Sequence, residues 1–360
     1  MKFNSQLYQG TARLVDFLPK GKGKARNILF SLWQTYPSWD PWLIQDGDIY
    51  RLFYLVGSRN ADTWWLEGSI HGAISTDMKV WENLGKVLDV NPENSWEAGR
   101  MLAGCTRKED GIYYLFYSAA GKGVEIMNEG IGLATSFDGL NWQRSSTKEL
   151  IKPDGNHRWY GQFKRLMGTT EYDHYQWRDP YVVKDPKTGK YYMFICAYLK
   201  EGGEGKFRGC VGVAVADKIS GHYELLPPAA IPFVAGTNES IFYEMERPQV
   251  IYKNGKYNLF FSCWTIWLNP KWVNKVGKEM ISDSSLYWYV ADDITGPYLP
   301  VSEKPVVKGS EKTGLYGTNF FPSPNNAEEF IAYGWYYRRM TLAILPIHQV
   351  QWDERSLEIV

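Results

Sequence analysis

Short runs of alternating aromatic and aliphatic residues, each preceded by a turn signal, recur along the chain. They are GDIYRLFYLV at 47–56, GIYYLFYSA at 111–119, GKYYMFICA at 189–197, GKYNLFFSC at 255–263 and, less regularly, EEFIAYGWYY at 328–337. An alternation with a period of two, bounded by Gly, Asp or Asn, predicts β-strands. The five copies therefore predict a repeat protein built from strands.

A second element follows each of these runs, with small residues, an Asp or Ser turn and often an aromatic strand. It occupies 70–85, 131–145, 211–226, 286–301 and, more weakly, 340–352. The constant order and a spacing of about 55–80 residues fit four-stranded blades with inserted loops. We predict an all-β fold, a five-bladed β-propeller of antiparallel blades around a central funnel, because closing the ring removes long exposed sheet edges.

The chain is expected to form one propeller domain over residues 1–360, with residues 1–30 as an N-terminal extension. Helix signals are sparse, and no stretch rich in Pro, Gly or Ser divides the chain into two domains. The segments 145–176 and 265–283 lack strand alternation, so we expect inserted loops over one face.

The composition indicates a neutral substrate. The 40 basic and 40 acidic residues balance, so no charge pattern points to nucleic acid or an anionic membrane. Aromatic residues make up 16% of the chain. Strands favour aromatic residues, but their rings also bind the apolar faces of sugars. We expect a small carbohydrate as the partner, and the sequence leaves the oligomeric state open.

The cysteines and the N-terminus predict a cytoplasmic protein. Cys105, Cys196, Cys210 and Cys263 show no CxxC spacing, and three of them lie in apolar runs, so we expect reduced, buried thiols. The N-terminus lacks the apolar stretch of a signal peptide, and no run of about eighteen apolar residues occurs. The five histidines are dispersed, so neither a metal nor another cofactor is predicted.

Acidic residues stand at three of the predicted first strands. They are Asp40 in SWDPW, Asp179 in QWRDPY, and Glu244 and Glu246 in YEMERPQ. Because the first strand of each blade lines the central channel, we expect these side chains to converge near the axis. Asp-Pro and Arg-Pro can also simply open a strand, with Arg178 and Arg247 neutralising the acids. Three equivalent positions in three blades favour a site over that explanation.

Clustered acids in a propeller channel fit glycoside hydrolysis. That reaction uses two carboxyl groups that flank the scissile bond, one ionised and one protonated. Gathering several acids in a dry pocket raises the pKa of one of them. A third acid can bind sugar hydroxyls and share in stabilising the transition state.

These motifs resemble glycoside hydrolase family 68, the levansucrases, inulosucrases and bacterial β-fructofuranosidases, which shares a five-bladed propeller with the family 32 invertases. The resemblance extends from about Trp39 to Arg339 and is strongest in the W-D-x-W, R-D-P and E-x-E-R segments. It implies that Asp40 is the nucleophile, that Asp179 stabilises the transition state, and that Glu246 is the general acid and base. The further substrate-binding residues that it implies are Trp39, Trp96, Arg178, Glu244, Arg247, Tyr316 and Trp264.

One departure from the family bears on specificity. Where the family commonly has an Arg after the fourth repeated strand, this chain reads SCWTIW, with Trp264 at that place. The position helps to bind the leaving glucose or the acceptor. The surrounding segment 264–272 is predicted equally well as a lid, an acceptor subsite or an interface.

The resemblance implies a retaining enzyme that cleaves a β-fructofuranoside, such as sucrose or a related oligosaccharide, through a covalent fructosyl-enzyme. We expect hydrolysis or short-chain transfer in preference to polymer synthesis. Two alternatives remain: a propeller glycosidase of the arabinanase or xylosidase type from the related family 43, and a carbohydrate-binding propeller without catalysis.

Overall fold

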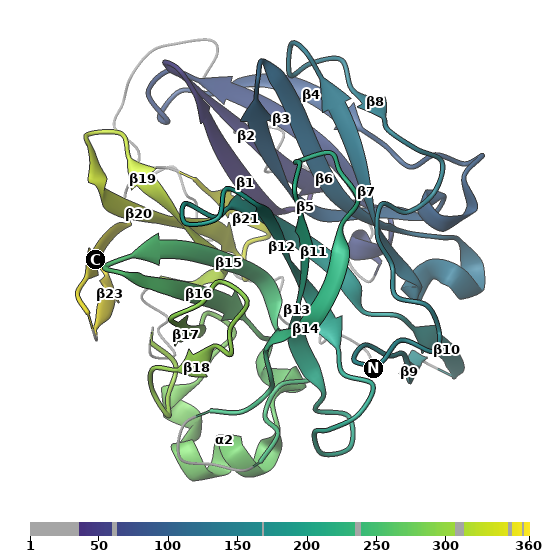
Figure 1. Cartoon of the computed structure of the whole chain (residues 1–360), viewed down its shortest axis with the longest axis vertical. Helices are drawn as coiled ribbons and strands as arrows, with labels where there is room; N and C mark the ends of the chain where they lie inside the picture. Colours follow the sequence, from purple (N-terminus) through teal and green to yellow (C-terminus); the bar gives the residue numbers. More distant parts are fainter. Residues whose placement is uncertain are drawn as a thin grey trace.

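The computed structural model describes residues 36–59, 63–167, 169–234, 239–306, 313–344, 348–354 and 356–360. Five antiparallel sheets surround a common centre (Figure 1). Blade one contains β1 (Ser38–Asp46), β2 (Ile49–Val56), β3 (Ser69–Ser75) and β4 (Glu82–Leu88). Blade two contains β5 (Arg100–Glu109), β6 (Ile112–Ala120), β7 (Glu129–Ser136) and β8 (Gln143–Arg144). Blade three contains β11 (Trp177–Lys184), β12 (Tyr191–Tyr198), β13 (Gly209–Ala216) and β14 (Glu224–Ala230).

Blades four and five complete the ring. Blade four contains β15 (Glu246–Lys253), β16 (Lys256–Ser262), β17 (Leu286–Ala291) and β18 (Leu299–Pro300). Blade five contains β19 (Leu315–Ser323), β20 (Asn326–Tyr336), β22 (Gln349–Trp352) and β23 (Leu357–Ile359), with β21 (Thr341–Ala343) also paired to β20. The predicted all-β, five-bladed propeller is confirmed. The predicted N-terminal extension lies outside the described residues.

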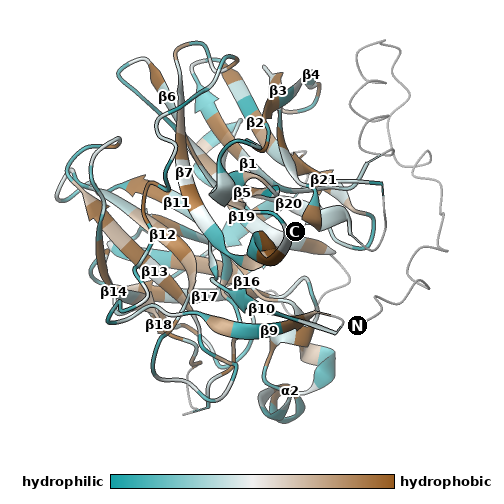
Figure 2. Ribbon diagram, turned by 90° about the vertical axis from the view of Figure 1, so that its right-hand side faces the viewer, coloured by the Kyte–Doolittle hydropathy of each residue, from teal (hydrophilic) through white to brown (hydrophobic). Residues whose placement is uncertain are grey.

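The five repeated aromatic runs form the second strand of each blade, namely β2, β6, β12, β16 and β20. A second strand pairs with the first and third strands and is covered on both faces by the neighbouring blades, so it is apolar almost throughout. All eight residues of β12 are buried. Figure 2 shows hydrophobic residues along β11, β12 and β13.

Aromatic side chains join neighbouring blades. For example, the rings of Phe260 in blade four and Phe320 in blade five lie 4.7 Å apart, edge to face. The four cysteines are free and buried, as predicted. The sulfur of Cys105 in blade two accepts a hydrogen bond from the Val182 N–H of blade three at 3.2 Å. The described residues include no helix long and apolar enough to cross a membrane.

The pairing order separates long connections from tight turns. Each first strand pairs antiparallel with the second through a short hairpin, as at 47–48, 110–111 and 254–255. The connections from second to third strands and from blade to blade therefore emerge at the opposite face, where the first strands begin. We call this the mouth face, and the face with the short hairpins the tail face.

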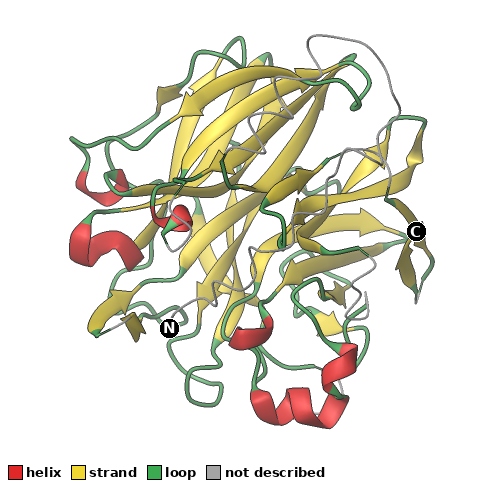
Figure 3. Cartoon of the chain, turned by 180° about the vertical axis from the view of Figure 1, so that it is seen from behind, coloured by secondary structure: helices red, strands yellow, loops and turns green. Residues whose placement is uncertain are grey.

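Both segments that were expected to be inserted loops belong to the mouth face, but neither is irregular throughout. Segment 145–176 contains a hairpin of β9 (Phe163–Met167) and β10 (Thr170–His174). Segment 265–283 contains η6 (Thr265–Trp267), α2 (Pro270–Val276) and η7 (Lys278–Met280) (Figure 3). The side chain of Asn269 accepts the Lys271 N–H at 3.0 Å and is followed by Pro270, a start signal for α2 that the expectation of a loop missed. Three further short 3-10 helices lie in mouth connections, η3 (Trp64–Leu66), η4 (Ser95–Glu97) and η5 (Gly123–Met127).

Candidate active site

A bulge interrupts the pairing of each first strand near the mouth. The register shifts between Trp39 and Trp42 in β1, and it shifts at the corresponding places in β5, β11, β15 and β19. Four of these bulges contain one residue with positive φ, namely Asp40 (46°), Asp179 (57°), Arg247 (55°) and Gly317 (58°). Non-glycine residues adopt this conformation at a cost, and bulges of this kind redirect a side chain out of the sheet. The backbone thus turns Asp40, Asp179 and Arg247 out of their strands.

The bulges correct the expected equivalence of the three acids. Asp40 and Asp179 occupy the same position in blades one and three, but the matching residue in blade four is Arg247. Glu246 stands one residue earlier, in line with Trp39 and Arg178. Asp40 and Asp179 are the third residues of β1 and β11, whereas Glu246 is the first residue of β15. Because Arg178 and Glu246 share a level in adjacent blades, their side chains meet across the channel, with Nη2 2.6 Å from Oε1.

Arg178, in blade three, connects acids of blade two with acids at the start of blade four. Besides Glu246, its Nη2 contacts Glu244 Oε2 at 2.8 Å, and its Nη1 contacts Glu129 Oε2 at 3.1 Å. The other oxygen of Glu129 pairs with Arg100 at 3.1 Å. Burial would raise the pKa of Glu129, but Arg178, His174 and Arg100 outweigh burial and hold that pKa well below its usual range. Sequence reasoning missed Glu129 and Arg100 because blade two carries no acid-Pro motif.

Glu246 is held from two sides. Arg178 binds its Oε1, and the Tyr316 hydroxyl of blade five donates a hydrogen bond to its Oε2. Tyr316 in turn stacks on Trp264, with ring centroids 4.0 Å apart and planes 19° from parallel. Arg178 and Tyr316 therefore contact Glu246 directly, and Trp264 is connected to it through Tyr316.

Asp40 is positioned by the indole of Trp335 and by Arg247. Trp335 Nε1 donates to Oδ1 at 3.1 Å, and Arg247 Nε lies 3.9 Å from the same oxygen. Asp179 is fixed more tightly, because its Oδ2 accepts the Arg247 N–H at 3.0 Å and its own N–H donates to Ser118 Oγ at 2.8 Å. Sequence reasoning missed Trp335, which lies in the least regular of the repeated runs, and Ser118.

Exposure divides the four acids into two pairs. The side chains of Asp40 and Glu246 keep 16% and 15% of their surface exposed. Those of Asp179 and Glu244 keep 4% and 3%. Asp40 and Glu246 are therefore the two carboxyl groups that a substrate at the mouth reaches most readily, whereas Asp179 and Glu244 form the floor and wall around them.

The acids outnumber the guanidinium groups that neutralise them. Burial raises the pKa of Asp40 to about 7, with Arg247 opposing the shift and Asp179 and Glu246 adding to it. Burial raises the pKa of Asp179 to about 6 and that of Glu244 to about 8, in both cases with a contribution from the Glu246 carboxylate. The cluster therefore keeps protons up to near neutral pH, and they are shared among carboxyl groups whose charges interact.

Two tryptophans that the resemblance implied, Trp39 and Trp96, pack away from the acids. Trp39 is 4% exposed and packs edge-on against Trp64, with centroids 4.7 Å apart. Trp96 in η4 stacks on Tyr117 at 6.0 Å, and its indole N–H donates to the Thr147 carbonyl at 3.2 Å. Trp96 thus packs within blade two and Trp39 packs against Trp64, whereas the network around the acids contains Arg178, Glu244, Arg247, Tyr316 and Trp264. The described residues contain no group of three or more His, Cys, Asp or Glu side chains suited to a metal ion.

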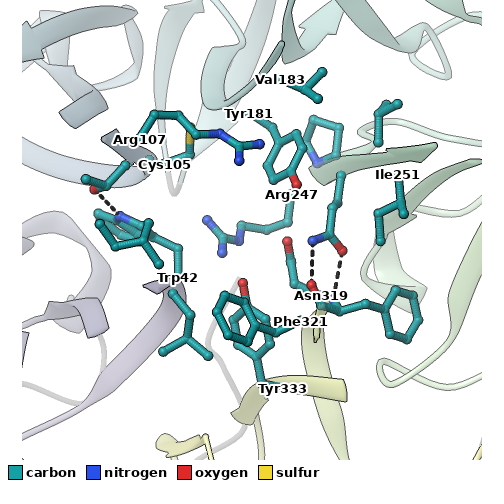
Figure 4. Close-up of a pocket in the computed structure, with 18 of the residues that line it drawn as sticks. Trp42, Cys105, Arg107, Tyr181, Val183, Arg247, Ile251, Asn319, Phe321 and Tyr333 are labelled. Carbon is teal, nitrogen blue, oxygen red and sulfur yellow. Dashed lines mark hydrogen bonds between the residues drawn. The ribbon is translucent and has the colours of Figure 1, made fainter. Parts of the chain in front are cut away.

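The channel continues behind the acids toward the tail face. A cavity of about 500 Å³ lies there, lined by the later residues of the first strands, including Tyr181 and Asn319 (Figure 4). Arg247 lies in the middle of this ring of side chains, and its Nη2 donates to the Pro41 carbonyl at 2.6 Å. Arg247 therefore stands between this cavity and Asp40.

The raised pKa of Glu244 predicts how stability depends on pH. The folded protein binds this proton more tightly than the unfolded chain, so its contribution to the free energy of unfolding is complete below about pH 4.5 and is lost as the pH rises through about 8. Glu244→Gln is expected to stabilise the protein at pH 8 by about 1–3 kcal/mol and to change little at pH 5. Urea unfolding at both pH values measures the difference, with Glu204→Gln in an exposed ion pair as control. Equal effects of Glu244→Gln at the two pH values would contradict a buried, protonated carboxyl.

Comparison with known proteins places this network in a family. Residues 35–339 match the model of glycosyl hydrolases family 43. A levansucrase from Rahnella aquatilis is 25% identical over 67% of this chain and 58% of its own length, so the chain spans little more than half of that relative. An inulosucrase from Halalkalicoccus jeotgali, solved with kestose bound, superposes with a TM-score of 0.69 at 20% identity over 90% of this chain and 87% of its own.

A solved thermostable family-43 glycoside hydrolase also shares the fold, with a TM-score of 0.61 at 18% identity over 90% of this chain and 93% of its own. The levansucrase and inulosucrase matches confirm the resemblance drawn from the W-D-x-W, R-D-P and E-x-E-R segments. The chain belongs to glycosyl hydrolases family 43, and it shares its propeller with the levansucrases and inulosucrases that its motifs resemble.

Proposed function

We propose that this protein is a retaining β-fructofuranosidase or fructosyltransferase that acts on sucrose or a related oligosaccharide. One observation carries the proposal. Asp40 and Glu246, the two more exposed acids, belong to a single contact network with the buried acids Asp179 and Glu244. A nucleophile and a proton donor on an otherwise buried carboxyl cluster is the arrangement that a two-step displacement at an anomeric carbon requires.

In the first step, the ionised Asp40 carboxylate attacks the anomeric carbon of the fructosyl group, and the bond to the leaving oxygen breaks. Glu246 transfers its proton to that oxygen, so glucose or a longer sugar departs neutral. Trp335 and Arg247 fix one oxygen of Asp40, which leaves the other free for attack. The product of this step is a covalent fructosyl-enzyme.

In the second step, Glu246 takes a proton from water or from an acceptor hydroxyl, and that oxygen attacks the same carbon and releases Asp40. Asp179, held by the Arg247 N–H, is positioned to bind fructosyl hydroxyls and to share in stabilising the positive charge of the transition state. Glu244 and Arg178 keep Glu246 in place. We assign Trp39 to packing against the fructosyl ring, and Trp96 to the more distant wall in blade two.

We further propose a cytoplasmic location and hydrolysis or short-chain transfer in preference to polymer synthesis. Trp264 supports the preference for hydrolysis or short-chain transfer, because an indole offers a growing polymer fewer hydrogen bonds than the arginine expected at this position.

One observation favours a second candidate. The family model that matches residues 35–339 is family 43, which supports a glycosidase of the arabinanase or xylosidase type on the same propeller. The same carboxyl cluster would serve that reaction, with a pentosyl group in place of the fructosyl group.

The decisive assay incubates the protein with sucrose, raffinose and simple arabinosides and follows released glucose, fructose, arabinose and oligosaccharides. We expect cleavage of the fructosides, with retention of configuration at the anomeric carbon of the first-formed fructosyl product, followed by the signal of that carbon in carbon NMR. Cleavage of arabinosides alone would replace the proposed function by the second candidate. Inversion at the anomeric centre would rule out a covalent intermediate on Asp40.

A further inference from the structure

The cavity behind the acids combines a cationic part with an apolar wall. Of the described residues that line it, Arg107, Lys108 and Arg247 are basic, and only Asp179 is acidic. The wall is mostly aliphatic and aromatic. A largely apolar cavity of a few hundred Å³ with a small number of polar groups is the usual form of a small-molecule site.

This cavity reaches the surface at the tail face. Lys108 and Tyr252 line it at the tail ends of β5 and β15, and both are exposed, with 34% of the Lys108 side chain and 42% of Tyr252 accessible. At the opposite end of the cavity, Arg247 stands between it and Asp40. A ligand that enters at the tail face therefore does not pass the acids at the mouth.

Arg247 has a donor that the protein leaves unused. The residue is only 6% exposed and lies in the middle of the ring of side chains in Figure 4. Its Nη2 donates to the Pro41 carbonyl at 2.6 Å, but its Nε is buried and has no hydrogen-bond partner among the described residues. Buried donors are nearly always paired, so this guanidinium group has the capacity for a further acceptor.

Arg107 has no acidic partner. Its Nε donates to a backbone carbonyl of blade three at 2.6 Å, and its guanidinium carbon lies 5.4 Å from the centroid of the Tyr181 ring. The ionisable groups that interact with its charge are Tyr181, Cys105 and Tyr333, none of them a carboxylate. Arg247 also interacts with Cys105 and Tyr333, so the two guanidinium groups border the same part of the cavity. A cation that is withdrawn from water without a partner is costly, and an anion between the two groups would lower that cost.

We propose that this cavity binds a small organic carboxylate that enters from the tail face. The carboxylate lies between Arg107 and Arg247, because guanidinium groups offer paired N–H donors that match its two oxygens. The apolar body lies against the wall that contains Val183, Ile251 and Phe321. An inorganic anion would leave this wall unfilled, and a neutral ring would leave the guanidinium groups unpaired. The proposed function makes no use of the cavity, so this site is additional to it.

The ligand is connected to the acids through Arg247. The Arg247 N–H donates to Asp179 at 3.0 Å, and its Nε lies 3.9 Å from Asp40. A bound carboxylate shares the charge of Arg247 with these acids, so it is expected to slow the reaction without competing for the mouth. This consequence rests on the proposed function, whereas the binding itself does not.

The binding test titrates the full-length protein with benzoate in a calorimeter. Benzamide keeps the ring without the charge and acetate keeps the charge without the ring, so we expect each to bind at least about 10-fold more weakly than benzoate. Arg107→Gln removes one guanidinium group and is expected to weaken benzoate binding about 10-fold or more. Val183→Phe narrows the cavity without changing a charge and should weaken it likewise. Lys184→Gln, beside Val183 but in an exposed ion pair with Glu109, should bind benzoate as the wild type does.

Thermal unfolding checks that the variants are folded. If the wild type does not bind benzoate, or if folded Arg107→Gln and Val183→Phe bind it as tightly as the wild type, the inference is wrong. With sucrose as substrate, saturating benzoate is expected to lower kcat about 3-fold or more at an unchanged KM, and to have little effect on Arg107→Gln. An unchanged kcat would refute the contact with Arg247, and a rise in KM alone would place benzoate at the mouth. Failure to cleave any fructoside would overturn the proposed function and leave the calorimetric test unaffected.

Discussion

Asp40→Asn is expected to lower kcat for fructoside hydrolysis by about 10,000-fold or more, because the variant has no nucleophile to form the covalent intermediate. The fold should survive. Burial already raises the pKa of Asp40 to about 7, so a neutral side chain of the same shape suits this position. The Asn side chain can still accept the hydrogen bond from Trp335. Initial rates with sucrose measure the loss, and thermal unfolding at pH 8 checks that the variant remains folded.

Asp46→Asn is the matched control for this variant. Asp46 lies on the same strand, β1, but at its tail end, where it pairs with Lys108 at 2.7 Å. We expect near wild-type activity from it. Mass spectrometry after rapid quenching should detect a fructosyl adduct on the wild-type protein and none on Asp40→Asn. If Asp40→Asn kept more than a few per cent of wild-type activity, another group would have to be the nucleophile.

Glu246→Gln is expected to lower activity by a factor that depends on how readily the leaving group departs without a proton. Glucose is a poor leaving group without a proton, so we expect about a 1,000-fold fall in kcat/KM for sucrose. The 4-nitrophenolate group of 4-nitrophenyl β-fructofuranoside can depart without protonation. With this substrate, Glu246→Gln should lose far less activity in the first step. Added azide can attack the fructosyl-enzyme without a general base, so it should accelerate turnover of the variant. The comparison of both substrates, with and without azide, measures the two roles of Glu246 separately.

Glu204→Gln serves as control for the loss of a carboxylate, because Glu204 lies in an exposed ion pair with Lys271 at 3.0 Å. It should leave both substrates unaffected. Equal losses on sucrose and on the aryl fructoside in Glu246→Gln would mean that Glu246 does not protonate the leaving group. In that case Glu244, whose pKa burial raises to about 8, would be the acid to test next.

The repeated aromatic runs were sufficient to predict the fold. Each second strand is buried between its two partner strands and the neighbouring blades, and burial on both faces forces a dense apolar pattern that remains visible in the sequence, as in β12. Short outer strands leave a weaker pattern. β8 and β18 contain two residues each, and β9 and β10 lie in a segment whose charged residues resemble those of a loop.

The acids were predictable because they stand in short motifs that contain a proline. Their predicted equivalence was wrong, because the three acids were aligned with one another. Aligning the motifs on Pro41, Pro180 and Pro248 puts Arg247 at the level of the two aspartates, as the bulges do. The partners Trp335, Ser118 and Glu129 were missed because they lie on second and third strands, where buried polar groups carry no motif.

The division between mouth and tail faces separates the parts of the molecule that evolution can change independently. The first strands and their bulges hold the acids, whereas η6, α2 and the β9–β10 hairpin are carried by connections that leave the ring at one face. A connection can lengthen, shorten or exchange its aromatic residues without altering the pairing of any first strand. Proteins on this scaffold can therefore acquire new leaving groups or acceptors by remodelling the connections alone, while the displacement chemistry is inherited unchanged.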